Sequence, residues 1–374
     1  MQPGRSLPDL VAEVRRQSSP AFKRDAVVAS TMLTVHSNGE TALSFGADAP
    51  AFTVAPLASR QLGEHLGVPA RWWDALGAHT TDWRTPDGQP LFDVTVNSLL
   101  AARPPDERRL VRTLDGRARA ILSDRFRPID NGPVLAALLP WLQEQASAGW
   151  IDPGQASMDV TDQNLYLRLV STRLEGEVGV GQTVRAGVEI RNSEVGLGAF
   201  VVRPLLFTLA CSNGAVVETQ VQRRAHIGAA LGGHDGNAWE WLSDEALAAR
   251  SQATVLEMRD VVQGALTEAM FQRTLARAQE AAGQRVPRPV AAVTWVAERY
   301  GLAEQETADV LNAFLAGGDR SVWGLSSAVT LVAQQAPTFD RSVELEHVGG
   351  RLLSLPECEA RALVAAADPR RRAA

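Results

Sequence analysis

The most constraining feature of this sequence is that its strand-like and helix-like apolar patterns occupy separate stretches. Residues 157–171, 184–192 and 199–211 alternate or run apolar as strands do. From residue 242 onwards, apolar residues return every three or four positions, as on one face of a helix. The helices expected there span 245–282, 290–300, 303–315 and 322–335. Such segregation favours an α+β fold, with an antiparallel, strand-rich central core of β-β-β-α type followed by a mostly helical C-terminal region.

Two tight-turn signals organise the first part of the chain. Asn38-Gly39 and Asp115-Gly116 each lie between short apolar runs. Both dipeptides tolerate the positive φ angles that two-residue hairpin turns need, so each predicts a β-hairpin. The paired runs are 32–36 with 42–45 and 110–114 with 118–122.

The first 30 residues are polar and are interrupted by Pro3, Pro8 and Pro20, so we expect a loosely ordered start. Gly132-Pro133 predicts a helix to about Gln145, which Pro140 should bend or end early. Residues 92–100 fit either a helix or a strand. The expected organisation is a loosely ordered N-terminus at 1–30, a mixed α+β core domain at 31–240, a helical region at 241–360 and a basic tail at 361–374.

Composition excludes several classes of protein. No stretch approaches the roughly 18 apolar residues of a membrane helix, and the first 16 residues lack the apolar core of a signal peptide. Two cysteines in 374 residues are too few for a disulfide scaffold or a cysteine-rich zinc site. We therefore expect a soluble protein of a reducing cytoplasm, with no membrane association.

The usual motifs of cofactor and metal chemistry are missing. Lys23 is the single lysine, so no Gly-Lys-Ser/Thr phosphate loop can form, and 179–184 lacks the third glycine of a dinucleotide fingerprint. The six histidines include no pair three or four residues apart. Cys211 could be served by His226, but a buried structural cysteine is the better interpretation. We expect no cofactor, no metal and no catalytic residue set.

Arginine placement is more informative, because arginine holds phosphates in a planar fork. Residues 103–127 hold eight arginines and four acids, whereas 240–318 hold seven arginines and eleven acids. A basic strand region backed by an acidic helical region suits an anionic partner, although a solvated face with scattered ion pairs is the alternative. The candidate nucleic-acid contacts are Arg117, Arg119, Arg125, Arg127, Arg223, Arg224 and His226, with Trp239 beside a glycine-rich loop as a base-stacking side chain.

Several ordered motifs resemble one family. They are Gly116–Asn131, Arg191–Ala199, Pro204–Phe207, Cys211–Gly214, Arg223–Gly228 and, before the paired tryptophans, Leu62–Pro69. Together, from about residue 55 to 335, they resemble the phage/plasmid-like proteins grouped as domain of unknown function 932. The resemblance implies an association with phages, plasmids or integrated elements, and it transfers no catalytic motif. Asn192 and Ser193 can also be explained structurally, because such side chains bind freed backbone groups at a strand end.

The expected order of three strands and a long helix is similar to the core of Red-beta-type phage proteins and eukaryotic ring-forming single-strand annealing proteins. That similarity is an analogy of topology and implies a basic groove around an oligomeric ring. The leading hypothesis is therefore a non-enzymatic, mobile-element-associated protein that binds and anneals single-stranded DNA as a homo-oligomer.

Two alternatives stay open at the level of sequence. Folding could bring Glu194, Asp124, Asp130 and His226 together as the acid–base or metal groups of a nucleic-acid-processing enzyme. The helical region could instead bind another protein, as in an interaction or anti-defence factor.

Overall fold

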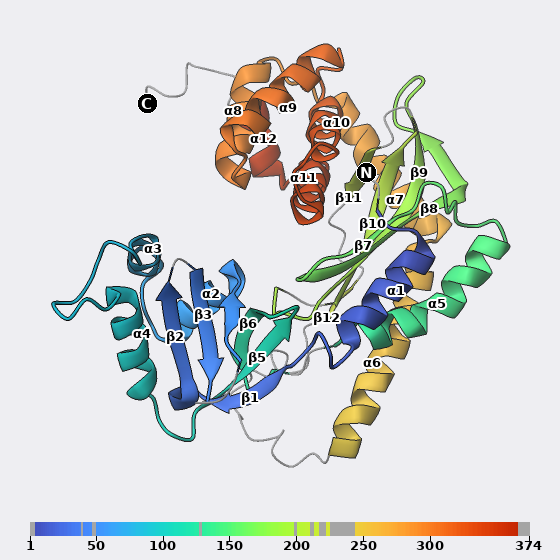
Figure 1. Cartoon of the computed structure of the whole chain (residues 1–374). Helices are drawn as coiled ribbons and strands as arrows, with labels where there is room; N and C mark the ends of the chain where they lie inside the picture. The colour runs from blue at the N-terminus through green and yellow to red at the C-terminus, as the bar shows by residue number, and fades with distance from the viewer. Residues whose placement is uncertain are drawn as a thin grey trace.

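The computed structural model describes residues 4–38, 40–46, 50–126, 129–197, 200–209, 213–216, 222–224 and 244–365. These residues form two six-stranded sheets, followed by a helical C-terminal region (Figure 1). The fold is therefore α+β, as the separated sequence patterns predict. No helix in the described part of the chain has both the length and the apolar character that crossing a membrane requires.

The first sheet has the strand order β1-β5-β6-β4-β3-β2, and all its pairings are antiparallel except that between β4 and β6. Its strands are β1 (Ala26–Ala29), β2 (Leu33–Asn38), β3 (Glu40–Phe45), β4 (Phe52–Val54), β5 (Arg108–Leu114) and β6 (Arg117–Ser123). Both predicted hairpins are present, as β2–β3 and β5–β6. At the β5–β6 turn, Asp115 and Gly116 have φ angles of 51° and 76°, the left-handed conformation that this dipeptide tolerates.

Three helices cover one face of the first sheet: α2 (Pro56–His65), α3 (Ala70–Ala78) and α4 (Leu91–Ala101). The segment that fitted either a helix or a strand is α4. Its Phe92, Val96 and Leu100 recur at helical spacing and are buried against the strands, so tertiary packing selects the helix.

The N-terminal segment differs from the expected loose order, because Leu7–Ser18 forms helix α1. Ser6 caps the helix by accepting from the Asp9 N–H, and Pro8 lies in the first turn, where a proline costs no hydrogen bond. Leu10 and Val14 are buried against α5 and the central sheet. Pro8 therefore lies in the first turn and Pro20 lies beyond the last residue of the helix, so neither breaks it.

The central sheet is antiparallel, with β8, β9 and β10 as its long inner strands. Its strands are β7 (Ser157–Val160), β8 (Asn164–Glu177), β9 (Thr183–Ser193), β10 (Phe200–Thr208), β11 (Asn213–Val216) and β12 (Gln222–Arg224). Pro204 lies inside β10, between the stretches that pair with β12 and with β11. That position suits a residue with no N–H to donate.

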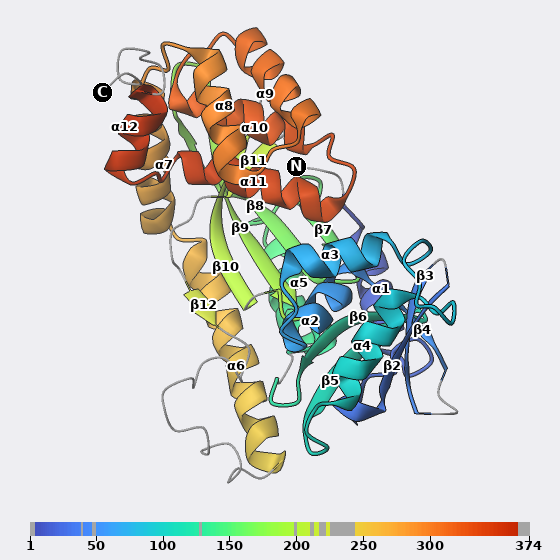
Figure 2. The ribbon, with the colours of Figure 1, turned by 90° about the vertical axis from the view of Figure 1, so that its left-hand side faces the viewer.

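Alternation gives the inner strands two different faces. Leu167, Val188 and Val202 belong to one buried cluster with α1, α5 (Asn131–Ser147) and α6 (Asp244–Ala265), whereas the next residues along each strand are Arg168, Glu189 and Arg203. Figures 1 and 2 show α1, α5 and α6 lying against this sheet. Pro140 lies on the exposed side of α5, and the helix continues past it to Ser147.

The predicted helix at 245–282 is two helices. Thr267 caps the second by accepting from the Met270 N–H, and this cap separates α6 from α7. The remaining helices gather at one end of the central sheet (Figure 1). They are α7 (Glu268–Gly283), α8 (Pro289–Tyr300), α9 (Glu304–Ala316), α10 (Val322–Ala333), α11 (Phe339–Leu352) and α12 (Glu357–Ala365).

Helix α11 was not expected from the sequence. Gly349 allows it to approach α10 closely, because a Cβ at that position would lie 2.4 Å from the Thr330 methyl carbon. Ser326 Oγ of α10 donates to the Gly349 carbonyl at 2.8 Å. The glycine that weakens the helical sequence pattern is thus what lets two helices pack together.

Candidate nucleic-acid interface

Glu194 lies at the centre of a buried ion cluster between the two sheets. Its Oε2 accepts from Arg119 at 2.5 Å, from Arg112 at 3.1 Å and from Lys23 at 3.4 Å. Its Oε1 accepts from the Asn131 N–H at 2.7 Å. The six charged members, called here the Glu194 cluster, are Lys23, Asp25, Arg112, Arg119, Asp130 and Glu194. Three cations therefore face three carboxylates at this joint.

A β-bulge brings Arg119 into the cluster. Arg112 pairs with Ala120 and Thr113 pairs with Ala118, so Arg119 is an extra residue without a partner in the β5–β6 register. Its side chain is 2% exposed, and its Nη1 also donates to the Asp162 carbonyl at 3.0 Å. The spacing of Arg117 and Arg119 would place both on one face of a regular strand, but the bulge leaves Arg117 exposed and Arg119 buried. In this structure Arg119 is not available to a phosphate.

The cluster also bears on the alternative of an acid–base or metal enzyme. Burial acts to raise the pKa of Glu194, but Arg119, Lys23 and Arg112 outweigh it and hold that pKa at about 2. A carboxyl group with such a pKa stays ionised near neutrality and is a poor proton donor. Arg112 bridges the three carboxylates, at 3.0 Å from Asp25, 2.8 Å from Asp130 and 3.1 Å from Glu194. A guanidinium thus lies where these carboxylates converge.

The residues around Glu194 bind backbone groups, as the structural interpretation of this motif expects. Asn192 Nδ2 donates to the Ile129 carbonyl at 2.7 Å and to Asn131 Oδ1 at 2.8 Å. Ser193 Oγ donates to the Gln163 carbonyl at 3.0 Å. The Asn-Ser-Glu motif therefore fastens the end of β9 to the start of α5 and to the β7–β8 turn.

The other predicted contacts fall into two groups. Arg117 and Arg125 are exposed and have no ion-pair partner within the residues that the structure describes. They lie at opposite ends of β6, so they do not form one compact site. Arg223 and Arg224 are described only as part of β12, which pairs with Phe200 and Val201 of β10. Arg127, His226 and Trp239 lie outside the described residues.

Basic and aromatic residues gather at the turn end of the β5–β6 hairpin, where Arg117 begins β6. They are Arg16, Phe22, Arg24 and Arg117, and they are called here the hairpin-end patch. The Asp115 N–H donates to the Phe22 carbonyl at 3.0 Å, and the Arg24 N–H donates to Thr113 Oγ1 at 2.8 Å. These bonds hold the segment after α1 against the hairpin.

Charge and exposure make this patch suitable for an anionic, flat-ringed ligand. Phe22 is 42% exposed, and the Arg16 guanidinium lies 4.9 Å from its ring centroid. Arg24 is exposed and has no ion-pair partner in the described part of the chain. The nearby Asp115 and Asp25 are already paired, with Arg16 and Arg112 respectively. Phe22 and Arg24 are not among the contacts predicted from the sequence, because they lie far from the 103–127 arginines along the chain.

A second buried cluster joins the central sheet to α11. Arg168 pairs with Glu346, and His347 Nε2 lies 2.6 Å from Glu189 Oε1. Arg203 approaches Glu189 at 3.4 Å. These five residues are called here the α11 cluster. Burial acts to raise the pKa of Glu189, but His347, Arg168 and Arg203 hold it at about 2. Burial raises the pKa of Glu346 although Arg168 opposes that change.

Ser30, His65 and Glu107 meet at hydrogen-bond distance but do not form a nucleophilic triad. His65 Nε2 lies 3.3 Å from Ser30 Oγ and 2.9 Å from Glu107 Oε1, so both partners use the same ring nitrogen. A triad needs them on different nitrogens. Burial and the nearby Arg109 lower the pKa of His65 to about 4. Ser30 is also completely buried, so this group has a structural role.

One cavity with an aromatic lining lies at the C-terminal end of α5. Trp141, Trp150 and Gln263 line a volume of about 340 Å³. Trp150 is 38% exposed, and the Arg173 guanidinium lies 4.1 Å from its ring centroid. The cavity is a second place where an exposed aromatic side chain and an exposed arginine lie together.

Within the described ranges, no group of three or more His, Cys, Asp or Glu side chains is arranged to hold a metal ion. Scans against protein-family models, curated protein sequences and solved structures found no match to this chain.

Proposed function

We propose that this chain binds single-stranded nucleic acid through the hairpin-end patch. The observation that carries the proposal is that Arg24 and Arg117 are exposed and lack an ion-pair partner among the described residues. They lie at the same end of the β5–β6 hairpin as exposed Phe22, whereas Arg112 and Arg119 form ion pairs in the Glu194 cluster. Proteins that bind single strands combine arginines along the backbone with aromatic rings on which bases stack. In this proposal Arg24 and Arg117 hold phosphates and Phe22 stacks on a base.

The finer points of the proposal come from the sequence. We place the protein among mobile-element-associated, recombination-type factors that anneal DNA as homo-oligomers, and we retain Arg125, Arg127, Arg223 and Arg224 as further phosphate contacts. A cytoplasmic location is part of the proposal and is supported by Cys358, an exposed free thiol that suits a reducing compartment.

The test is binding of a labelled single-stranded oligonucleotide, followed by fluorescence anisotropy between about 50 and 200 mM salt. Each phosphate contact on a single strand contributes about −0.7 to the slope of log affinity against log salt. Arg24→Gln and Arg117→Gln should each weaken binding and reduce that slope by about 0.7. Phe22→Ala should weaken binding with little change in slope, because stacking releases no counterions.

Arg273→Gln is the matched control. Arg273 is an exposed arginine of α7 with no ion-pair partner in the described part of the chain, and it lies outside the patch. Its replacement should leave affinity and slope unchanged. Absence of binding at about 50 mM salt would overturn the proposal, as would equal losses for Arg117→Gln and Arg273→Gln. Light scattering with and without the oligonucleotide tests the oligomer.

A further inference from the structure

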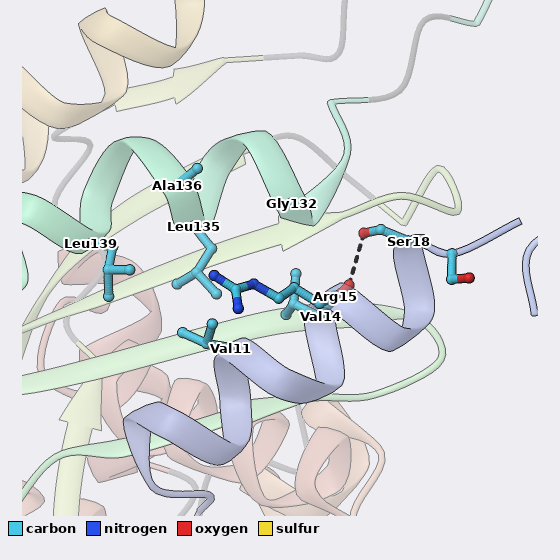
Figure 3. Close-up of a pocket in the computed structure, with 9 residues that line it drawn as sticks. Val11, Val14, Arg15, Ser18, Gly132, Leu135, Ala136 and Leu139 are labelled. Carbon is cyan, nitrogen blue, oxygen red and sulfur yellow. Dashed lines mark hydrogen bonds between the residues drawn. The ribbon is translucent and has the colours of Figure 1, made fainter.

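A groove lies between α1 and α5, on the outside of the central sheet. Its volume is about 360 Å³, and apolar side chains including Val11, Leu135 and Leu139 line most of it (Figure 3). The two helices run in opposite directions along it, because Val11 and Leu139 lie at one end and Ser18 and Gly132 at the other. Ligand pockets typically have volumes from about 300 Å³ upwards, so a small molecule is a suitable occupant.

Arg15 places a positive charge in this apolar groove. Figure 3 shows its guanidinium extending between the two helices, towards Leu135. No carboxylate lines the groove, and Arg15 has no ion-pair partner in the described ranges. Its neighbour Arg16 points elsewhere and pairs with Glu13 and Asp115. An anion at this position would therefore have to come from a ligand.

Two serines complete the polar part of the lining. Ser18 Oγ donates to the Val14 carbonyl at 2.8 Å, so its own hydrogen is used. Ser19 Oγ accepts from the Ala21 N–H at 3.4 Å, which leaves its hydroxyl hydrogen for another acceptor. The Arg15 guanidinium therefore offers donors to a carboxylate, while most of the remaining lining offers apolar contact.

We propose that this groove binds an amphiphilic carboxylate, with its acyl chain between α1 and α5 and its carboxylate at Arg15. The lining of α1 runs from Val11 to Ser18, which is about 10 Å along a helix and therefore suits a chain of medium length. This site is independent of the proposed nucleic-acid binding, which uses other residues.

The experiment is isothermal titration calorimetry of the full chain with hexanoate, octanoate and decanoate, all below micelle-forming concentrations, and with 1-octanol as the uncharged counterpart. Affinity should rise by up to about fourfold for each added methylene group that is buried. Octanoate should bind at least about threefold more tightly than 1-octanol, because only the carboxylate makes charge-assisted hydrogen bonds.

Two variants test the two halves of the site. Arg15→Gln should remove the preference for octanoate over 1-octanol while keeping the dependence on chain length. Ala136→Phe should weaken both ligands by about tenfold, because Ala136 is an exposed residue of the lining and the larger ring would fill the groove. Circular dichroism is used to check that each variant folds. Arg273→Gln is again the control.

The proposal is overturned if octanoate fails to bind at millimolar concentration, or if Arg15→Gln keeps the carboxylate preference. It is also overturned if Ala136→Phe binds octanoate as the unmodified chain does. An acidic amphipathic peptide that binds where octanoate does not would assign the groove to a protein partner instead. None of these outcomes depends on whether an oligonucleotide binds.

Discussion

The two buried ion clusters use the same residue types but form different kinds of joint. The Glu194 cluster fastens the first sheet to the central sheet, and solvent reaches its rim, where the Asp130 side chain is 41% exposed. The α11 cluster fastens the central sheet to α11, and Arg168 and Glu346 are fully buried. In the first cluster Glu194 is held ionised, whereas in the second burial drives Glu346 towards its neutral form. The number of ion-pair partners and their exposure to solvent therefore decide whether the glutamate at each joint is held charged. The presence of an Arg–Glu pair alone does not decide it.

The largest expected effect is on the α11 cluster. Arg168→Met removes the ion pair of buried Glu346, so the free energy of unfolding should fall by about 3–5 kcal/mol. The double variant Arg168→Met/Glu346→Leu removes the stranded charge and should lose clearly less. Urea unfolding followed by tryptophan fluorescence measures both. Equal losses would show that the pair itself, rather than the isolated charge, determines stability at this joint.

Glu194→Gln should have a smaller effect, of about 2–3 kcal/mol. The amide can still accept from the Asn131 N–H, and Arg112 keeps Asp25 and Asp130, but Arg119 loses its carboxylate. The same unfolding measurement applies, with the exposed Glu304→Gln as control. A loss as large as that of Arg168→Met would contradict the contrast between a rim-exposed and a closed cluster.

Acid should affect the contributions of Glu194 and Glu346 with opposite signs, whereas Glu189 of the α11 cluster, whose pKa is lowered, should respond as Glu194 does. The folded pKa of Glu194, about 2, lies below the unfolded value of about 4.3, so its stabilisation is present above the unfolded pKa and is lost as pH falls towards 2. Between pH 5 and pH 3 the loss should be on the order of 1.5 kcal/mol, and Glu194→Gln should lack it. The folded pKa of Glu346 is raised, so its contribution favours folding at low pH and is lost as pH rises.

Urea unfolding at pH 5, 4 and 3 checks this difference. Relative to the unmodified chain, Glu194→Gln should show a shallower loss of stability on acidification and Glu346→Gln a steeper one. If stability changed with pH to the same extent in the two variants, the opposite contributions expected of Glu194 and Glu346 would be contradicted.

The smallest expected effect belongs to Arg117, two residues from Arg119. Arg117→Gln should change stability by less than about 0.5 kcal/mol, because the side chain is exposed and unpaired in the described part of the chain. Arg119→Gln should cost several times more, because it leaves Glu194 without its shortest contact. Thermal unfolding of the two variants gives the comparison. Similar shifts would mean that the bulge does not separate the two arginines in solution.

Much of the fold follows from local signals. Asp115-Gly116 specifies its hairpin through backbone angles, and the helical spacing after residue 242 gives most of the C-terminal helices. Helix α11 was not predicted from the spacing of apolar residues, because Gly349-Gly350 and the buried Glu346 and His347 interrupt its apolar pattern. Helix α1 was not predicted either, because only the structure shows that Pro8 lies in the first turn of the helix.

The site was less predictable, because its residues meet across long stretches of chain. Arg117 and Arg119 have the same spacing that any exposed strand would give, and the bulge that buries Arg119 leaves no simple mark in the sequence. Lys23 reaches Glu194 across 171 positions, and Phe22 and Arg24 reach the β5–β6 turn in a similar way. The arginine count identified a basic region, but it did not show which of these arginines form ion pairs.

The pairing of Arg168 with Glu346 also has a consequence for synthesis, since 178 positions separate the two residues. A ribosome adding about 5–20 residues per second would produce Glu346 on the order of 10–40 s after Arg168. Until Glu346 is synthesised, the nascent central sheet contains Arg168 without the carboxylate of α11 that pairs with it in the folded chain. The sheet can therefore complete its charged face only after α11 has been synthesised, which makes the docking of α11 a late step in the folding of this sheet.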